Sequence, residues 1–260
     1  MAVCILACAA GLVGSPGVRL TVLGSGSAFS GCGHNSAYCV DGRVLVDCGC
    51  AVQVQMPRAG LAVGDVSVVL LTHFHADHTY MLPVFLGARA LEVDEPAPLV
   101  VGGPVGTWEY VSRLLRTGYG AGLQGIIAER LRPSAVVLQD GSDAGLPGGY
   151  RVRAFAVVHS TGPSLAYAVT GPYGVTCGFS GDTEVCAGLR RCVSVSDVMV
   201  CECTSFEGPL ASHVWAGEVA GLVEEFPGVR FVLSHLSERR PVSGAVLAHD
   251  LLTLDIAPRS

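Results

Sequence analysis

The stretch Leu71-Thr-His-Phe-His-Ala-Asp-His78 decides the fold, because it places three histidines and an aspartate within six positions. It closes a short apolar run that reads as a buried strand. Imidazole and carboxylate groups are ligands that zinc prefers. A loop leaving a strand can turn such side chains in two directions. His73 and His75 are then placed to hold one ion, and Asp77 and His78 a neighbouring one. The alternative is a solvated histidine-rich loop, which leaves the cluster's position after a buried strand unexplained.

Three further candidate ligands stand just beyond other strand-like runs, where loops gather at the mouth of a sheet. They are His159, Asp182 and His235. Each alone is read more simply as a structural histidine or a turn aspartate. Together with the histidine-rich run, they complete the ligand count for two metal ions.

Apolar periodicity predicts an α/β protein with mixed sheets. The predicted strands are Val18–Leu23, Val44–Asp47, Val66–Leu71, Ala135–Leu138, Arg151–Val158, Leu165–Thr170, Val175–Phe179, Asp197–Cys201 and Val229–Leu233. The predicted helices are His78–Ala90, Thr107–Arg116, Val185–Cys192, His213–Phe226 and Val242–Leu251. Ser212 is the predicted N-cap of the fourth helix.

Composition limits the class of protein. The chain has 260 residues, 50% of them hydrophobic and 15% charged, which is enough to bury a large core and argues against disorder. The formal net charge is −6, which disfavours a protein that grips long nucleic acid through a basic surface. It still permits a small anionic substrate at one prepared site.

The cysteines and the N-terminus bear on location. Eleven cysteines without any CxxC pair are interpreted as reduced core thiols, typical of the cytoplasm. The apolar start, residues 1–14, is too short to span a bilayer and has no basic region before it, so no membrane association is expected. Residues 1–18 are predicted to be an N-terminal extension or an extra edge strand, and residues 19–260 a single domain.

These ligand motifs resemble the metallo-β-lactamase fold superfamily, from Arg19 to about His249. The resemblance implies an αββα sandwich of two mixed β-sheets flanked by helices, with a dinuclear metal site at one edge. It implies two Zn²⁺ ions per chain, with Mn²⁺ or Fe²⁺ as alternatives, and a hydroxide between the ions as nucleophile. The implied ligands are His73, His75 and His159 for the first ion, Asp77, His78 and His235 for the second, and Asp182 as the bridge. Asp77 is also a candidate to orient the hydroxide.

Two glycine-containing segments are similar to the ribonuclease Z-like branch. They are Val22–Ser30, with Asn35 downstream, and Val46-Asp-Cys-Gly49. Without the family, the glycines suggest a nucleotide loop, but the chain has neither a GxGxxG motif nor a Walker lysine. Asp47 is predicted to accept a hydrogen bond from a ligand histidine. Ser27 and Asn35 are candidate substrate contacts.

The branch also has a Glu–His pair that protonates the leaving oxygen of a phosphodiester. Glu202-Cys-Thr-Ser-Phe206 and His213 resemble its motifs, so Glu202 and His213 are candidate catalytic residues beside Asp77. An alternative reading makes His213 only the first residue of a helix. Arg239 and Arg240 are either phosphate contacts or a solvated pair.

Departures from the branch change the expected substrate. Members that process tRNA carry a flexible arm, whose bacterial form would fall between His159 and Asp182, yet these residues are only 23 positions apart. Ala76 replaces the usual glycine, His34 an arginine, and Trp215 the threonine of the histidine motif.

We therefore expect a phosphodiesterase for small or cyclic diesters, and the resemblance is compatible with a homodimer. The alternatives are hydrolysis of a lactone, thioester or β-lactam, tRNA 3′ processing, and metal binding without catalysis.

Overall fold

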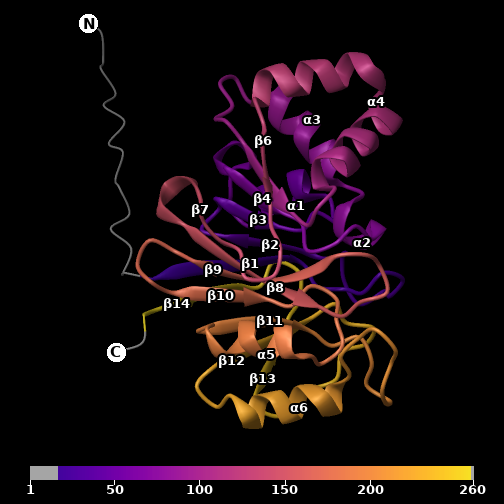
Figure 1. The fold of residues 1–260 in the computed structure, drawn as a ribbon, viewed down its shortest axis with the longest axis vertical. Helices are drawn as coiled ribbons and strands as arrows, with labels where there is room; N and C mark the ends of the chain where they lie inside the picture. The colour runs from indigo at the N-terminus through magenta and orange to yellow at the C-terminus, as the bar shows by residue number, and fades with distance from the viewer. Residues whose placement is uncertain (1–16, 259–260) are drawn as a thin grey trace, which may run out of the picture.

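The chain folds into two seven-stranded β-sheets that pack face to face (Figure 1). The computed structural model describes residues 17–258, so the apolar N-terminal stretch and its predicted extension or edge strand lie outside the described residues. The first sheet has the order β14-β1-β2-β3-β4-β5-β6, and the second β13-β12-β11-β10-β9-β8-β7. Both sheets mix parallel and antiparallel neighbours.

The first sheet consists of β1 Val18–Gly24, β2 Ala37–Val40, β3 Val44–Val46, β4 Val68–Leu70, β5 Val100–Gly103, β6 Ser134–Val137 and β14 Thr253–Ile256. The second consists of β7 Asp143–Gly145, β8 Arg151–Val157, β9 Ser164–Thr170, β10 Thr176–Phe179, β11 Val198–Glu202, β12 Arg230–Ser234 and β13 Ala245–Leu247. The helices are α1 Val52–Arg58, α2 Ala76–Thr79, α3 Leu82–Glu92, α4 Thr107–Leu131, α5 Ala187–Ser194 and α6 Ala216–Glu225, with 3₁₀ turns at Val63–Asp65 and Pro147–Gly149.

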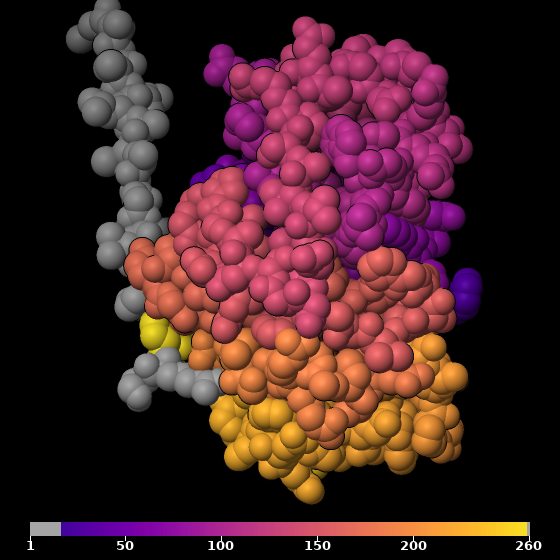
Figure 2. All heavy atoms as spheres, in the orientation of Figure 1, coloured from indigo at the N-terminus to yellow at the C-terminus, as the bar shows by residue number. Residues whose placement is uncertain are grey.

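Alternation of side chains along the strands produces three apolar layers. Residues such as Val22 and Phe179 fill the space between the sheets. The opposite face of the first sheet packs against α1, α3 and α4. The outer face of the second sheet packs against α5 and α6. The two halves stack one above the other, N-terminal half above and C-terminal half below (Figure 2). The predicted αββα sandwich of two mixed sheets is confirmed.

The helix predictions needed correction at several ends. The predicted helix His78–Ala90 is two helices, α2 and α3, because Pro83 stands in the first turn of α3, where its missing N–H costs nothing. Helix α4 continues past Arg116 to Leu131 through a kink at Gly120, whose φ is 75°. The glycine-rich sequence around that kink hid the second half of the helix.

Two predictions were wrong. Val242–Leu251 is not a helix: its middle forms strand β13, parallel to β12, after a left-handed turn at Gly244. Ser212 is not an N-cap, since helix α6 begins at Ala216 and Ser212 has a φ of 65°. The carboxylate of Glu218 instead accepts a hydrogen bond from the N–H of the N-cap residue Trp215, at 3.2 Å. His213 therefore lies in a loop. Short strands β2, β5, β7, β13 and β14 and helix α1 were not predicted.

The described residues agree with the expected absence of disulfides. All nine cysteines among residues 17–258 are free thiols, and seven of them are buried. In the same part of the chain, no helix combines the length and the apolar character needed to cross a bilayer.

One buried hydrogen bond ties the two sheets together where the histidine-rich loop begins. The hydroxyl of Tyr167, on β9, donates to the carbonyl oxygen of Leu71 at 2.7 Å, and the Tyr167 side chain is fully buried. Changing Tyr167→Phe leaves a buried carbonyl short of a partner. We expect a loss of about 1–3 kcal/mol in the free energy of unfolding, with an unchanged denaturant slope in urea unfolding. Stability equal to that of the unchanged protein would contradict this role.

Candidate metal centre

The candidate ligands come from the carboxyl ends of strands in both sheets. The histidine-rich loop follows β4 of the first sheet. In the second sheet, His159 follows β8, Asp182 follows β10 and His235 follows β12. In open α/β sheets, the carboxyl ends of parallel strands commonly carry the binding site. The face-to-face packing brings these ends to one edge of the sandwich.

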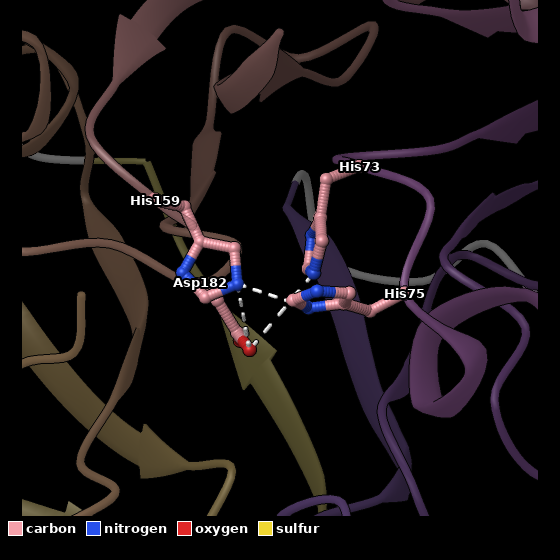
Figure 3. A group of neighbouring side chains, drawn as sticks. All are labelled: His73, His75, His159 and Asp182. Atoms are coloured by element: carbon pink, nitrogen blue, oxygen red, sulfur yellow. Dashed lines mark hydrogen bonds and ion pairs between the residues drawn. The ribbon is translucent and has the colours of Figure 1, made fainter. Parts of the chain in front are cut away.

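The first group contains His73, His75, His159 and Asp182 (Figure 3). One ligand atom from each lies within 4.8 Å of the others. His75 Nδ1 and His159 Nε2 are 3.0 Å apart, and the Nε2 atoms of His73 and His159 each lie 3.9 Å from Asp182 Oδ2. Three neutral imidazoles and a carboxylate converging in this way can hold one divalent ion.

The second group contains Asp77, His78, Asp182 and His235. His78 Nε2 lies 3.6 Å from Asp77 Oδ2 and 3.2 Å from Asp182 Oδ1. His235 Nε2 lies 3.0 Å from Asp77 Oδ2 and 3.3 Å from Asp182 Oδ2. Asp182 thus belongs to both groups and could bind an ion in each. The structure brings together all seven residues that the sequence suggested as ligands.

Orphaned polar atoms test whether this site fits cations. Among the described residues, His73 Nε2, His78 Nε2 and Asp182 Oδ1 are buried without a hydrogen-bond partner. Leaving a buried polar atom unpaired costs roughly 1–3 kcal/mol. All three point into the two groups, where a cation would satisfy them together. Burial, reinforced by His78 nearby, holds the pKa of His73 well below its usual range, which favours the neutral, metal-binding form. The residues present therefore fit two divalent ions.

Asp47 holds the loop from behind, where the sequence suggested an acceptor. Its carboxylate accepts hydrogen bonds from the N–H and the hydroxyl of Thr72, both at 2.8 Å, and Oδ2 lies 2.8 Å from His78 Nδ1. The last contact assigns the proton of His78 to Nδ1 and leaves Nε2 for a cation. Burial disfavours the charged imidazole, but the charges of Asp182 and Asp47 outweigh it and raise the pKa of His78.

Close backbone packing explains two glycines of the site. A Cβ on Gly49 would come within 1.7 Å of the carbonyl oxygen of Asp77. Gly181, just before the bridging aspartate, has a φ of 56° and would bring a Cβ within 2.9 Å of the Thr72 side chain. Neither position has room for a larger residue. Gly49 therefore lets the loops after β3 and β4 of the first sheet approach each other, and Gly181 lets the loop after β10 of the second sheet pack against Thr72 of the first.

The buried Glu202 and the partly exposed His213 form a pair beside both groups. His213 Nδ1 lies 3.1 Å from Glu202 Oε2, and the His213 ring lies 5.0 Å from that of His159 and 5.6 Å from that of His235, centroid to centroid. Burial raises the pKa of Glu202, although the hydrogen bond to His213 acts against it. Burial also acts to lower the pKa of His213, but its hydrogen bond and attraction to Glu202 outweigh this and raise it.

The candidate substrate contacts are occupied by structural bonds. Arg239 donates to the carbonyl oxygens of Cys32 and Ala248 and to Ser25 Oγ, so its guanidinium holds loops together. Arg240 pairs with Glu207. Asn35 donates to the carbonyl oxygens of Ser27 and Ala28, and Ser27 is buried. Arg239, Asn35 and Ser27 thus hold the loop beside Leu236 in place, and their contact with a substrate stays a prediction.

Sequence reasoning missed the hydroxyls that connect these residues. Thr72 bonds Asp47 and His73 Nδ1, and Thr204 bonds both Glu202 and His235. Threonine carries little signal in a single sequence. The only sequence indication of their roles was position: Thr72 directly precedes His73, and Thr204 lies two residues after Glu202.

The fold and this cluster define the class of metal-dependent hydrolases with two packed mixed sheets. A family model described as the beta-lactamase superfamily domain matches residues 42–236, and the chain belongs to that superfamily. Within it, the chain falls in the ribonuclease Z-like branch. It is 27% identical to ribonuclease Z of Methanosarcina acetivorans over 313 aligned residues, covering 93% of this chain and 99% of the relative.

Solved structures share the fold. The crystal structure of human tRNase Z, short form, superposes with a TM-score of 0.73 at 23% identity, covering 92% of this chain and 100% of that chain. A diphosphatase from the PhnP family gives a TM-score of 0.70 at 18% identity, covering 93% of this chain and 98% of that chain.

Zinc should stabilise the protein, because an ion that binds only the folded chain raises the free energy of unfolding. The gain is about 2.7 kcal/mol when free metal is one hundred times its Kd. We expect Zn²⁺ to raise the melting temperature of chelator-treated protein, and His73→Ala to lose most of that rise. His249→Ala is the matched control, since His249 is exposed and belongs to neither group. A wild-type melting curve that zinc does not move would overturn the site.

Asp47→Asn should weaken metal retention while keeping the side-chain shape. The amide has one acceptor oxygen instead of two, so it cannot accept from both the N–H of Thr72 and Nδ1 of His78, and the support of the histidine weakens. Removing such a support typically costs 10–100-fold in metal affinity. The measurement is zinc content and affinity by chelator competition. Asp41→Asn is the matched control, because Asp41 is a hydrogen-bonded carboxylate at the other end of β3. Equal affinity in Asp47→Asn and wild-type protein would refute the prediction.

Proposed function

We propose that this protein is a phosphodiesterase that hydrolyses a small or cyclic phosphodiester at the two-ion site. The observation that carries the proposal is the Glu202–His213 pair placed beside both ligand groups. When bound, two cations would acidify a water molecule and offset charge on the phosphoryl oxygens. The departing alkoxide then needs a proton, whereas the thiolate that leaves a thioester does not.

His213 is placed to deliver that proton. Its Nδ1 is held by the carboxylate of Glu202, and among residues 17–258 no side chain or backbone group bonds its Nε2. Its ring lies between those of His159 and His235, so it borders the space where a reacting phosphate would sit. The His213 side chain is 20% exposed, so its proton can be renewed from solvent. Asp77, 10% exposed within the second group, is proposed to orient the attacking water.

A compact site favours a small substrate. His159 and Asp182 are joined by the hairpin β9–β10, whose turn spans only 171–175. The alignment with the Methanosarcina relative runs over 313 positions, more than the whole length of this chain, so the relative has residues that this chain lacks. The net charge is −6, and several surface arginines already pair with carboxylates. These features support a small anion over a long polyanion.

Processing of tRNA 3′ ends is the second candidate, because curated relatives that align along nearly the whole chain are named ribonuclease Z. This reaction would use the same ions and the same Glu–His pair as the hydrolysis of a small diester. Unlike that reaction, it also needs a surface that holds a folded RNA. Hydrolysis of a lactone, thioester or β-lactam remains a third possibility with the same metals.

A substrate panel with the zinc-loaded protein separates these functions. It comprises bis(p-nitrophenyl) phosphate, a cyclic nucleotide, a tRNA precursor with a 3′ trailer, a lactone, a thioester and a β-lactam. We expect turnover of the small diesters and none of the others. Cleavage of the precursor at the tRNA 3′ end would establish the second candidate instead. Lactone, thioester or β-lactam turnover without diester turnover would sink the phosphodiesterase assignment.

Substituting His213→Ala tests the proton donor on the same panel. We expect a loss of about 10²–10⁴-fold in kcat for diesters with an alkoxide leaving group. The loss should be smaller for bis(p-nitrophenyl) phosphate, because p-nitrophenolate departs without a proton. His249→Ala serves as the histidine control. Equal losses for both leaving groups, or no loss, would remove His213 from proton transfer.

A further inference from the structure

The hydroxyl of Thr204 touches three side chains of the site at once. Oγ1 lies 2.6 Å from Glu202 Oε2, 2.7 Å from His235 Nδ1 and 3.4 Å from His213 Nδ1. Thr204 lies two residues beyond the end of β11, and its own N–H donates to the carbonyl oxygen of Val214. It therefore stands between a candidate ligand of the second ion and the Glu202–His213 pair.

The single proton of this hydroxyl gives the contacts a direction. His235 turns Nε2 toward Asp77 and Asp182, so binding a cation there puts the ring proton on Nδ1. His235 Nδ1–H then donates to Thr204 Oγ1. The hydroxyl in turn has only the carboxylate of Glu202 left as a close acceptor. The order is His235 to Thr204 to Glu202, with His213 Nδ1 donating to the same carboxylate.

We propose that Thr204 is a positioning residue that fixes His235 and Glu202 against each other, and so couples the second ion site to the proton donor. One hydroxyl sets the tautomer and tilt of the His235 ring. The same hydroxyl occupies one lone pair of Glu202 Oε2 and thereby sets the angle at which His213 meets that carboxylate. The part of the proposal that concerns turnover rests on the proposed function, whereas the part that concerns metal retention does not.

Other groups near Thr204 do not supply this link. Glu202 Oε1 accepts from the N–H of Thr183 and lies 3.2 Å from His213 Nδ1, and neither contact reaches His235. Among the described residues, Thr204 alone is hydrogen-bonded to both Glu202 and His235 through its side chain. Loss of the hydroxyl leaves the buried His235 Nδ1 without its partner while the shape of the loop can be kept.

The experiment compares Thr204→Val, which keeps the shape and removes the hydroxyl, with Thr204→Ser, which keeps the hydroxyl. Thr204→Ala repeats the test with a smaller side chain in case valine disturbs folding. Thr21→Val is the matched control, because Thr21 is a buried threonine on β1 whose hydroxyl pairs with that of Thr253. The readouts are the rates at which the two zinc ions pass to a chelator, and kcat and KM for bis(p-nitrophenyl) phosphate and a diester with an alkoxide leaving group.

We expect Thr204→Val to release one of the two ions about 10–100-fold faster and to lose kcat by a similar factor, the range typical for groups that orient ligands. KM should change little, and Thr204→Ser should restore both readouts. Wild-type ion release in Thr204→Val and Thr204→Ala, or a Thr204→Ser variant as impaired as valine, would overturn the proposal. If the wild-type protein turns over no diester, the proposed function fails, and ion release still decides the role of Thr204.

Discussion

The structure depends on one costly feature, a buried cluster of histidines and carboxylates at the edge where the two sheets meet. The side chains of His73, His78 and Asp182 are almost fully buried, and each has an atom without a hydrogen-bond partner in the described part of the chain. A packed apolar core would avoid that cost. Two cations would offset it, because they would replace the missing partners of all three atoms and neutralise the carboxylates between them. The composition of the cluster therefore fits a metal site.

The rest of the sandwich holds the cluster in place. Asp47 and His235 both stand at strand ends in the left-handed region, with φ of 58° and 53°, although neither is glycine. Such backbone costs about 1–3 kcal/mol and persists only where the surroundings enforce it. The conformation of Asp47 is held by its bonds to Thr72. That of His235 is held by the bond between its Nδ1 and Thr204 and by the bond from the N–H of Leu236 to Ser25. The strained backbone at these two residues keeps the ligand side chains oriented. Less conformational entropy is then lost when the ligands bind a metal ion.

The sequence revealed the parts of this site whose chemistry is rare. Histidines and aspartates at the ends of apolar runs are scarce, so their pattern predicted all seven converging side chains, and its resemblance to the superfamily implied the two sheets and the edge. Short strands such as β2 and β13 went unpredicted because three or four residues carry no clear period. Val242–Leu251 was predicted to be a helix because its apolar spacing fits either structure, and its middle became a strand by pairing with β12.

The roles of the arginines could not be predicted from the sequence either, since a guanidinium bonds carbonyl oxygens as readily as phosphate. Only the three-dimensional arrangement showed that Arg239 does the former.

Charge distribution connects these observations with the choice of substrate. All 16 basic residues of the chain are arginines, and those at Arg19, Arg43, Arg151, Arg190, Arg191 and Arg240 form ion pairs with neighbouring carboxylates. A paired guanidinium offers little attraction to a phosphate backbone, because its charge is already balanced at close range. Two bound dications would instead concentrate positive charge within the one cleft where Asp77 and Asp182 converge. A field confined to a few ångströms can hold a single phosphodiester but cannot orient a folded RNA tens of ångströms long. For that reason the location of the charge, more than its sum, is the argument for the small diester that we propose as substrate.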